Sequence, residues 1–401
     1  MTFLTTSSLN MKKIIIFINK YLPGYKAGGP IQTIANMVEA IGDRYRFYIV
    51  TFDRDFGDLA PYPNIVYKQW MDVGKAKVRY LHRKEISFST YKDILNSEQF
   101  DLLYFQSFFN PLFTILPIIT YWVSHTSKAS LLIAPRGEFG SGAIKFKQFK
   151  KSIYLFVFRH IIYKQVPFSF HCSSQDEVDS LRHELISSAT CYSALDFSAQ
   201  DHIERQAIVP HNTNHTIRIA FLARLDPQKN IDFALTILKE IQTSVVFDIY
   251  GNTIFDDYVS LCKTIASTMP ENIIVSFAGT VPHDEVLNTL SNYNLFFFPT
   301  KNENFGHTIH EALRAGLPVL CSDQTPWHEL ESRNAGWEIP LDRPDLFKAK
   351  IEQFAAMTPE ERYQMRLAAL QYGIDVSHDK KTLHDNIAMF DSLLGNQSDN
   401  E

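Results

Sequence analysis

Short apolar runs that alternate with helical stretches fill both halves of this 401-residue chain and constrain its fold more than any other feature. They are apolar along their whole length, which is typical of strands in parallel sheets that helices cover on both faces. The chain is also long enough for two domains of roughly 200 residues each. We therefore predict an α/β fold with two Rossmann-like domains whose parallel sheets face each other across a ligand-binding cleft.

The segment 301–323, KNENFGHTIHEALRAGLPVLCSD, places two glutamates around the start of a predicted helix. Glu303 precedes the helix and Glu311 lies a little over one turn into it, so the two carboxylates can address different parts of one extended ligand. A strand that enters a helix through a glycine turn presents backbone N–H groups that suit a phosphate. The alternative is a solvated helix with two incidental glutamates. The predicted contacts at this turn are Asn304, Phe305 and Gly306.

A second motif, IRIAFLARLDPQKNIDFAL, spans residues 217–235. The pattern predicts a strand that ends near residue 225, a turn that contains a proline, and a helix with Asn230 as its N-cap. Arg224 and Lys229 then lie at the ligand edge of an open α/β sheet, where one planar and one point-like cation suit a diphosphate. The alternative is two surface cations that form ordinary ion pairs.

These two motifs together resemble the signature of retaining nucleotide-sugar glycosyltransferases of GT-B family 4, often written E-x7-E. The resemblance implies that Glu311 binds the nucleotide ribose and that Glu303 contacts hydroxyls of the donor sugar. It implies that Arg224 and Lys229 hold the diphosphate and that Glu303, Arg224 and Lys229 carry the catalysis. Family members often have glycine where this chain has Ala223. The implied reaction moves a hexose-type sugar, with retained stereochemistry, from a UDP-sugar to a glycan acceptor without a metal or other cofactor.

The expected domain boundaries follow from the same patterns. Residues 1–210 form the predicted acceptor-side domain, and residues 211–376 form the predicted nucleotide-sugar domain after a polar, turn-rich linker at 211–216. The resemblance implies that the final helix, 377–395, returns to the first domain. It also implies that the loop with Gly28 and Gly29 faces the diphosphate from the first domain, although a flexible turn is the alternative.

The segment that begins APRGEFG, at residue 134, follows another predicted strand. A PRG followed by a basic segment resembles a subgroup that builds bacterial surface polysaccharides, lipopolysaccharide among them. The resemblance implies a lipid-linked or lipopolysaccharide-type acceptor, with Arg136, Glu138 and Ser107 as its predicted contacts. The alternative is an Arg136–Glu138 ion pair that fixes a loop. The chain lacks the histidine that many family members carry near this position.

The stretch from Lys145 to Lys151 combines four lysines with two phenylalanines. Such a stretch suits the surface of an anionic membrane, and a helix that packs its aromatic face on the sheet is the alternative. The apolar stretch 101–123 is interrupted by polar residues and prolines, so we predict a strand, a turn and a buried helix rather than a membrane span. No signal peptide is evident, and the four scattered cysteines indicate a cytoplasmic protein. The basic stretch adds the expectation of peripheral contact with the inner face of the plasma membrane.

The charge and the short motifs of the chain bear on other classes of function. The net charge of −5 gives no basic field for nucleic acid. Asp53-Arg54-Asp55 matches a metal-binding D-x-D, but a lone D-x-D is common by chance and this one lies in the other half of the chain from the two glutamates. His307 and His310 are three apart on a predicted helix, with no third ligand evident, so no metal site is predicted. A nucleotide-sugar epimerase with the same fold is one alternative function. A non-catalytic nucleotide-sugar-binding partner of a polysaccharide assembly complex is the other.

Overall fold

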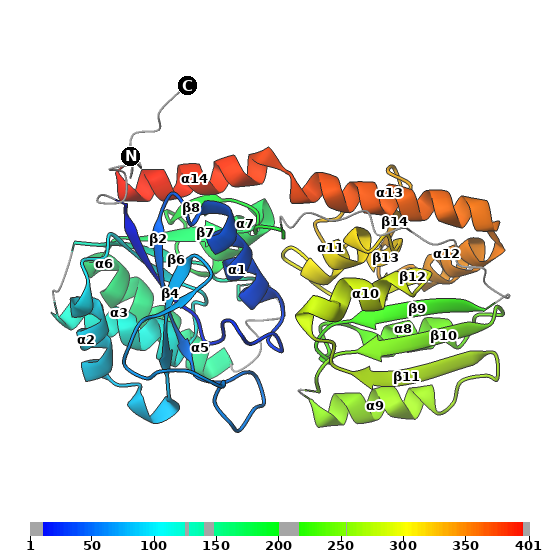
Figure 1. Ribbon diagram of the computed structural model, residues 1–401, viewed down its shortest axis with the longest axis horizontal. Coiled ribbons are helices and arrows are strands. Elements are labelled where there is room, and N and C mark those ends of the chain that lie inside the picture. The colour runs from blue at the N-terminus through cyan, green and yellow to red at the C-terminus, as the bar shows by residue number, and fades with distance from the viewer. Residues whose placement is uncertain (1–10, 125–127, 140–147, 200–215, 254, 396–401) are drawn as a thin grey trace, which may run out of the picture. The chain divides into compact units, whose positions relative to one another are not determined.

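A computed structural model describes residues 11–124, 128–139, 148–199, 216–253 and 255–395 (Figure 1). The chain divides into two compact units, each with its own sheet. The first unit comprises Met1–Gly24, Pro30–Phe197 and Lys380–Glu401, and the second comprises Tyr25–Gly29 and Ser198–Asp379. The second unit thus begins ahead of the expected linker, most of which lies outside the described residues.

The first unit contains an eight-stranded sheet in the order β3-β4-β2-β1-β5-β6-β7-β8. Its strands are parallel except for the edge strand β3, which runs antiparallel to β4. The strands are β1 Lys13–Phe17, β2 Arg46–Phe52, β3 Met71–Val73, β4 Ala76–Leu81, β5 Leu102–Phe105, β6 Ser130–Ile133, β7 Phe168–Cys172 and β8 Thr190–Ser193. The helical elements are α1 Gly29–Ile41, η2 Arg83–Glu85, α2 Phe88–Ser97, η3 Pro111–Ile115, α3 Leu116–Ser124, α5 Gln148–Val157, η4 Phe158–Ile162, α6 Tyr163–Gln165, α7 Gln175–Glu184 and α14 Lys380–Leu394.

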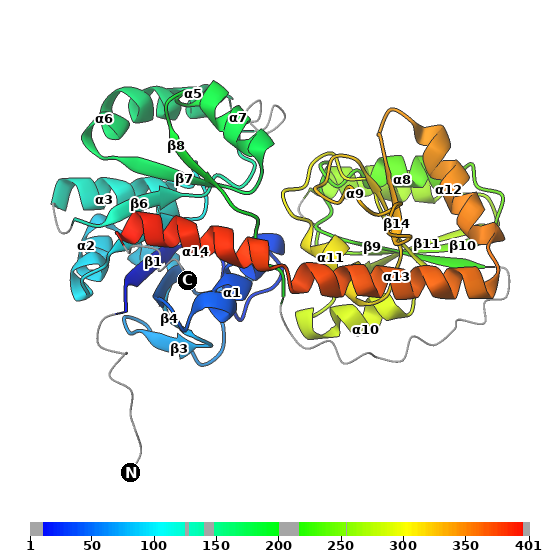
Figure 2. The same cartoon turned by 90° about the horizontal axis from the view of Figure 1, so that it is seen from above.

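Helices cover both faces of this sheet, which explains why its central strands β1, β2 and β5 are largely apolar. Successive residues of β1 enter two different cores, since Ile14 and Ile16 face one and Ile15 and Phe17 face the other. Helices α1 and α14 pack on the first of these faces (Figure 2). Residues of α2, α3, α5 and α7 pack on the second. The final helix, α14, therefore packs on the first unit, where the resemblance places it.

The second unit contains a six-stranded sheet in the order β11-β10-β9-β12-β13-β14, parallel throughout. Its strands are β9 Ile217–Leu222, β10 Val245–Tyr250, β11 Ile273–Gly279, β12 Leu295–Phe298, β13 Val319–Ser322 and β14 Gly336–Ile339. Its helical elements are α8 Ile231–Leu238, α9 Asp256–Ala266, η5 His283–Glu285, α10 Val286–Ser291, α11 His307–Arg314, α12 Pro344–Ala356 and α13 Pro359–Ser377.

The strand order of the second sheet reverses between β9 and β12. The chain runs outward from β9 through β10 to β11 and then returns to the other side of β9 to form β12. Loops that leave the carboxyl ends of two such strands diverge to opposite faces, and the crevice between them is where open α/β sheets bind ligands. Both expected motifs follow these two strands.

The start of α8 differs in one detail from the expectation. Asn230 occupies the N-cap position in a left-handed conformation, but its side chain makes no capping hydrogen bond. The hydroxyl of Tyr258, on α9, instead accepts from the N–H groups of Ile231 and Asp232 at 2.8 and 3.3 Å. A tyrosine distant in sequence therefore satisfies the helix terminus that a local cap would otherwise serve.

The stretch 101–123 forms β5, a turn and the helical segment η3–α3, as expected. Asn110 accepts from the N–H groups of Leu112 and Phe113, so the helical segment begins with a side-chain cap ahead of Pro111. Within the described part of the chain, no helix is both long and apolar enough to cross a bilayer.

Candidate donor site

Two loops meet at the carboxyl ends of β9 and β12. The N–H of Lys301 donates to Gln228 O at 2.8 Å, and the hydroxyl of Thr300 lies 3.2 Å from the same oxygen. These bonds join the segment after β12 to the segment after β9, although more than seventy residues separate them in sequence. The loop that carries Lys229 is therefore held against the loop that carries Glu303.

Lys229 and Glu303, expected to act on one ligand, contact each other directly. Lys229 Nζ lies 2.5 Å from Glu303 Oε2, and the two side chains are 13% and 20% exposed. The ammonium also lies over the ring of Phe298, the last residue of β12, 5.5 Å from its centroid. This ion pair places an ammonium and a carboxylate at one point of the switch between β9 and β12, where they can address a phosphate and a sugar hydroxyl.

The side chain of Arg224 is more exposed and more loosely paired than those of Lys229 and Glu303. Its side chain is 45% exposed, and Nη2 lies 3.6 Å from Oδ2 of the buried Asp226. An ion pair this long and exposed contributes little to folding. Most of the guanidinium thus stays available for a ligand.

Gly306 is the N-cap of α11 and has a φ of +82°, a left-handed conformation that favours glycine. A Cβ at this position would lie 3.1 Å from the Trp327 ring nitrogen and 3.2 Å from Glu303 Cγ. The glycine is thus needed for both its backbone conformation and its close packing. The first-turn N–H groups of α11, with the positive end of the helix dipole, lie next to Glu303.

The side chain of Phe305 packs in the hydrophobic core of the second unit and does not lie at the surface of the turn. It is buried, its carbonyl accepts from Trp327 Nε1 at 2.5 Å, and its ring packs against Trp327 and His310. Its expected donor contact is thus limited to its backbone. Asn304, next to it, is half-buried and stays a predicted donor contact.

Helix α13 packs against α11 and contacts it through His310. His310 is buried, and its Nε2 lies 3.1 Å from both Gly373 O and Ser377 Oγ. Burial and the nearby Arg314 lower the pKa of His310 to about 3, so its ring is neutral. Gly373 permits this approach, since a Cβ there would lie 2.8 Å from Arg314 N. His310 is thus part of the packing of α11 and is not offered to a metal.

Glu311 lies on α11 with its side chain 13% exposed, and its Oε1 is 3.6 Å from His283 Nδ1. Burial raises the pKa of this carboxyl to about 7, and Arg314 opposes part of the rise. A rise of this size corresponds to roughly 3 kcal/mol against the ionised form. A ribose that donates hydrogen bonds to the carboxylate would offset that cost.

The raised pKa of Glu311 predicts a pH dependence of stability. A carboxyl that keeps its proton longer in the folded chain than in the unfolded chain lowers the free energy of unfolding as pH rises from about 4.5 to 7. We therefore expect Glu311→Gln to raise the melting temperature at pH 8 and to change it much less at pH 4.5. Thermal unfolding of both proteins across this range checks it, with Glu329→Gln as an exposed control. An equal shift at both pH values would contradict the assignment.

The same residue predicts a pH dependence of binding. UDP affinity should rise through about pH 7 as Glu311 ionises, because the carboxylate accepts hydrogen bonds more strongly than the neutral acid. UDP titrates in this range as well, so the Glu311→Gln protein, titrated with UDP by calorimetry at the same pH values, supplies the baseline. Identical slopes in the two proteins would exclude Glu311 as the titrating group.

Gly28 and Gly29 open α1, and Gly28 has a φ of +71°. No atom lies within 4 Å of a Cβ built on Gly28, so its backbone conformation alone favours glycine there. The segment Tyr25–Gly29 groups with the second unit. Their contact with a diphosphate stays a prediction.

The expected acceptor contacts Ser107 and Glu138 bind each other in the first unit. Ser107 Oγ donates to Glu138 Oε1 at 2.7 Å, and the N–H groups of Phe108 and Phe109 donate to Oε2 at 2.6 and 3.2 Å. Burial is the largest influence on the Glu138 carboxyl and raises its pKa. Both side chains thus fix the turn after β5.

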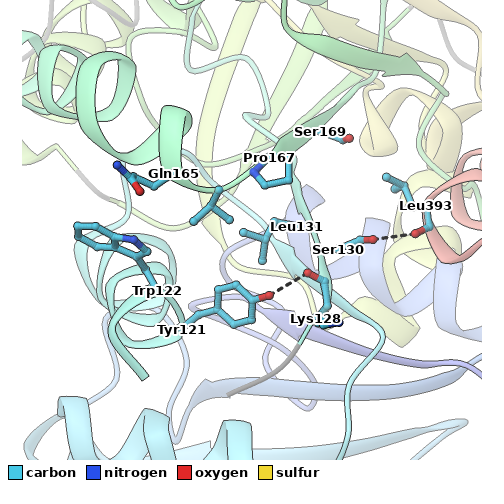
Figure 3. A pocket seen from close by; sticks show the side chains of 11 residues that line it. Tyr121, Trp122, Lys128, Ser130, Leu131, Gln165, Pro167, Ser169 and Leu393 are labelled. Atoms are coloured by element: carbon cyan, nitrogen blue, oxygen red, sulfur yellow. Dashed lines mark hydrogen bonds between the residues drawn. The ribbon is translucent and has the colours of Figure 1, made fainter. Parts of the chain in front are cut away.

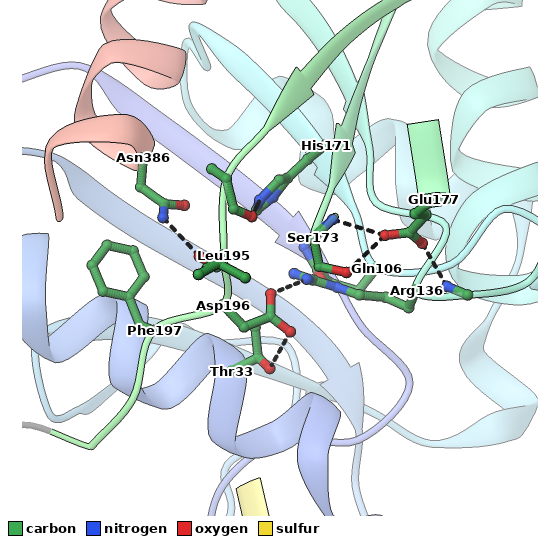
Figure 4. A network of polar contacts seen from close by, with 12 residues as sticks. Thr33, Gln106, Arg136, His171, Ser173, Glu177, Leu195, Asp196, Phe197 and Asn386 are labelled. Carbon is green, nitrogen blue, oxygen red and sulfur yellow. Dashed lines mark hydrogen bonds and ion pairs between the residues drawn. The ribbon is translucent and has the colours of Figure 1, made fainter. Parts of the chain in front are cut away.

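Arg136 forms its ion pair with Asp196, so the alternative of an Arg136–Glu138 pair is wrong (Figure 4). Its Nε and Nη2 also donate to Gln106 Oε1 at 3.1 and 2.9 Å, and Asp196 accepts from Thr33 at 3.1 Å. Arg136 has a φ of +54°, an uncommon conformation for a residue with a side chain. The network joins the exits of β5, β6 and β8 to α1.

Glu177, which the sequence did not single out, completes this loop support. Its Oε1 accepts from the N–H of Gly137 at 2.5 Å, and its Oε2 accepts from the N–H and hydroxyl of Ser173. Its position in the first turn of a predicted helix was the only sequence signal available, and such positions are common. Acceptor contact by Arg136, Glu138 or Ser107 stays a prediction.

Asp53 of the D-x-D motif is buried and paired within the protein. Arg54 Nε donates to its Oδ1 at 2.8 Å, and the Tyr67 hydroxyl donates to its Oδ2 at 2.9 Å. Across the residues that the structure describes, no three His, Cys, Asp or Glu side chains are grouped to hold a metal ion.

The basic stretch is described only in part. Lys145 and Lys147 lie outside the described residues, and Lys150 lies in α5. Lys151 Nζ lies over the ring of Phe109, 4.7 Å from its centroid. Contact of the stretch from Lys145 to Lys151 with a membrane stays a prediction.

Comparisons with known proteins agree with this architecture. The structure of WaaG, a glycosyltransferase involved in lipopolysaccharide biosynthesis, superposes with a TM-score of 0.62 over 95% of this chain and 100% of that one, at 12% identity. Anabaena HepE, solved with UDP and glucose, gives a TM-score of 0.62 over 96% and 100%, at 13% identity. The chain has the GT-B glycosyltransferase fold. The prediction of an α/β chain with two parallel-sheet domains is thereby confirmed.

The sequence of the second unit also matches a known protein family. Residues 204–371 match the family described as glycosyl transferases group 1. A protein in the cps region of Klebsiella pneumoniae is 23% identical over 241 residues, which are 57% of this chain. The aligned part spans 62% of that relative's length. The matched segment contains both switch-point loops of the GT-B chain.

Proposed function

We propose that the protein is a retaining glycosyltransferase that moves a hexose-type sugar from a UDP-sugar to a glycan acceptor. The observation that carries the proposal is the Lys229–Glu303 pair at the switch between β9 and β12, inside the segment that matches group 1 glycosyl transferases. A cation for the diphosphate and a carboxylate for the sugar are thus fixed beside the N-terminus of α11.

We assign the roles of the cationic groups from the negative charge that develops on the leaving group. As the bond from the anomeric carbon to the β-phosphate oxygen breaks, negative charge grows on that oxygen. Arg224, Lys229 and the N-terminus of α11 stabilise this charge where it forms. The reaction draws on these groups of the chain and on no metal ion.

The carboxylates divide the rest of the donor between them. In this structure Glu303 and Lys229 neutralise each other, and a bound donor exchanges that contact for two, with the ammonium on phosphate and the carboxylate on sugar hydroxyls. Glu311, deeper on α11, accepts from the ribose. The acceptor attacks the face from which the leaving group departs, which retains the configuration and needs no nucleophilic carboxylate.

We assign the acceptor to surface polysaccharide or lipopolysaccharide biosynthesis, with a lipid-linked glycan as the substrate. The relative in a cps region and the similarity to a lipopolysaccharide glycosyltransferase support this assignment. Ser107, Arg136 and Glu138, which are hydrogen-bonded within the first unit, remain the proposed acceptor contacts. We place the protein in the cytoplasm, at the inner face of the plasma membrane.

The test is a panel of nucleotide sugars, scored by nucleotide release with and without membrane extract and with and without a chelator. We expect release from one UDP-hexose to increase with the extract, to persist with the chelator, and to be absent in Arg224→Ala. Release from no donor above the level of that variant would overturn the proposal. Conversion of a donor to its epimer without release would indicate the alternative, an epimerase.

Peripheral membrane binding is a further expectation. Residues 139–175 contain six Lys or Arg and no Asp or Glu in a chain of net charge −5. In the same segment Phe156 is 62% exposed, and Ile153 and Ile161 are also exposed. We expect sedimentation with anionic liposomes at low salt and release at high salt, because about 1 kcal/mol per cation near the headgroups is screened by salt.

Two variants separate this expectation from a merely solvated helix. Gln at Lys145, Lys147, Lys150 and Lys151 should abolish sedimentation, and Phe156→Ser should weaken it. Leu59→Ser, which removes an even more exposed apolar side chain elsewhere in the first unit, is the control. Absence of liposome binding at every salt concentration would leave a solvated surface.

A further inference from the structure

We propose that the first unit carries a second, non-catalytic binding site for a neutral saccharide, in a cavity at the amino ends of β6 and β7. The cavity has a volume of about 540 Å³, within the range of about 300–1,000 Å³ that small-molecule sites occupy. Its lining combines side chains from α3, α6, both strands and α14 (Figure 3). The proposal goes beyond the proposed function, because a sugar can bind here whether or not the chain transfers one.

The cavity lies away from the ligand edge of its own sheet. Ser130 is the first residue of β6, and Ser169 is the second residue of β7. Arg136 and Gln106 follow the carboxyl ends of β6 and β5, at the opposite edge. A ligand in the cavity is thus separated from that edge by the length of the strands.

Aromatic and aliphatic side chains form one part of the lining. Tyr121 and Trp122, at the end of α3, stand beside Leu131, Val166 and Pro167. Figure 3 shows the indole of Trp122 next to the side chain of Gln165. A sugar ring presents an apolar face of C–H groups and a rim of hydroxyls, so a lining of this kind can cover the face while an adjacent amide binds the rim.

Polar groups without partners form the other part. In the described portion of the chain, no hydrogen bond within the protein engages the side chains of Trp122, Lys128, Gln165 or Ser169, and Lys128 and Gln165 are exposed to solvent. Together they offer an indole N–H, an ammonium, an amide and a hydroxyl, which is a mixed set of donors and acceptors. Hydroxyl groups of a sugar, which both donate and accept, match such a set.

Two further bonds hold the walls in place. The hydroxyl of Tyr121 donates to Ala129 O at 3.0 Å, and the hydroxyl of Ser130 donates to Leu393 O at 2.8 Å (Figure 3). The second bond connects the sheet to α14. Each oxygen still has lone pairs for a ligand, and a wall fixed in advance reduces the entropy lost on binding.

The charge of the lining selects against other ligands. Lys128 is the one cation among the lining residues, whereas a phosphate site generally combines several cations or a helix N-terminus. A purely apolar ligand would leave the amide, indole and hydroxyl groups without partners, which is unfavourable. A neutral saccharide satisfies both parts. If the proposed function holds, the site would bind a second segment of the glycan acceptor.

The test is saturation-transfer NMR on the full chain with glucose, galactose and N-acetylglucosamine, with UDP present to occupy the nucleotide site. We expect millimolar binding of at least one sugar, at least fivefold weaker binding in Trp122→Ala and in Gln165→Leu, and retention in Trp122→Phe. Glu303→Gln should bind equally well, since its carboxylate belongs to the other unit. Circular dichroism and melting curves establish that each variant is folded.

Two results would overturn the proposal: absence of saturation transfer from all three sugars, or unchanged binding in folded Trp122→Ala and Gln165→Leu. Nucleotide release from the donor, measured without membrane extract, should be unaffected in both variants, since neither residue lies in the candidate donor site. The two proposals therefore fail in different ways. If the saccharide site is wrong, sugar binding is absent or unchanged in the variants while donor turnover remains. If the proposed function is wrong, the native protein shows no donor turnover while sugar binding remains.

Discussion

Replacing Arg224 with alanine is expected to weaken UDP binding and to lower turnover by tens to hundreds of fold. The guanidinium is 45% exposed and only loosely paired with Asp226, so the loss falls on the ligand rather than on the fold. Removing one donor that stabilises a developing anion typically costs about 3 kcal/mol. Calorimetry with UDP, turnover with the donor sugar, and the melting temperature are the three measurements.

Arg218, on the strand that precedes Arg224, supplies a matched control. Its side chain is 48% exposed and its Nη2 lies 3.5 Å from Asp248, but it lies at the amino end of β9, away from the switch point. Arg218→Ala should therefore leave UDP affinity and turnover unchanged. Undiminished UDP affinity in Arg224→Ala would show that the diphosphate does not bind where we place it.

Lys229→Ala should lower affinity and turnover to a similar extent, and with it the melting temperature. Its removal leaves the mostly buried Glu303 without its partner, so the single variant combines loss of a ligand contact with loss of an ion pair. The double variant Lys229→Ala/Glu303→Gln separates these effects, because it removes the unpaired charge. Its melting temperature should return toward that of the native protein while UDP affinity stays low.

The two glutamates should fail in different ways when each is changed to glutamine. Glu311→Gln should weaken binding of UDP itself, because its proposed partner is the ribose. Glu303→Gln should leave UDP affinity within a few fold and lower turnover of the UDP-sugar by tens to hundreds of fold, because its proposed partner is the sugar. Calorimetry with UDP and single-turnover rates with the donor check the two effects separately.

Glu329, which pairs with Arg333 on the surface of the second unit, serves as the control for both. Equal losses of UDP affinity in the two variants would contradict the division of roles between Glu303 and Glu311. Full turnover in Glu303→Gln would exclude its contact with the sugar.

Several strands that cross the middle of each sheet were predictable because burial on both faces makes them largely apolar. β1, β2 and β5 in the first unit and β12 in the second follow such apolar runs, whereas Arg218 interrupts β9 and Asp248 interrupts β10. The edge strands β3, β8 and β14 were not predicted. They are short, and exposed positions interrupt β3 and β8, so they lack that pattern.

The geometry of the candidate donor site was predictable to the extent that its residues are close in sequence to a strand end. Glu303, Gly306 and Glu311 all lie on one strand–turn–helix segment, so their spacing carried the information. The Lys229–Glu303 contact depends on β9 and β12 being neighbours, which no local pattern encodes. The roles of Phe305 and Arg136 likewise depend on distant partners, Trp327 and Asp196, that only the folded chain brings to them.

The Tyr258 cap of α8 has a consequence for sequence variation in this protein. Because the hydroxyl of Tyr258 holds the N–H groups that immediately follow Lys229 and Asn230, the position of the ammonium depends on a residue in another helix. A Tyr258→Phe change removes a single oxygen and no ligand contact, yet it frees the end of the loop that carries Lys229. Natural or engineered variation on α9 can therefore adjust the reactivity of the donor site, so a search for activity-modifying substitutions should extend to this helix.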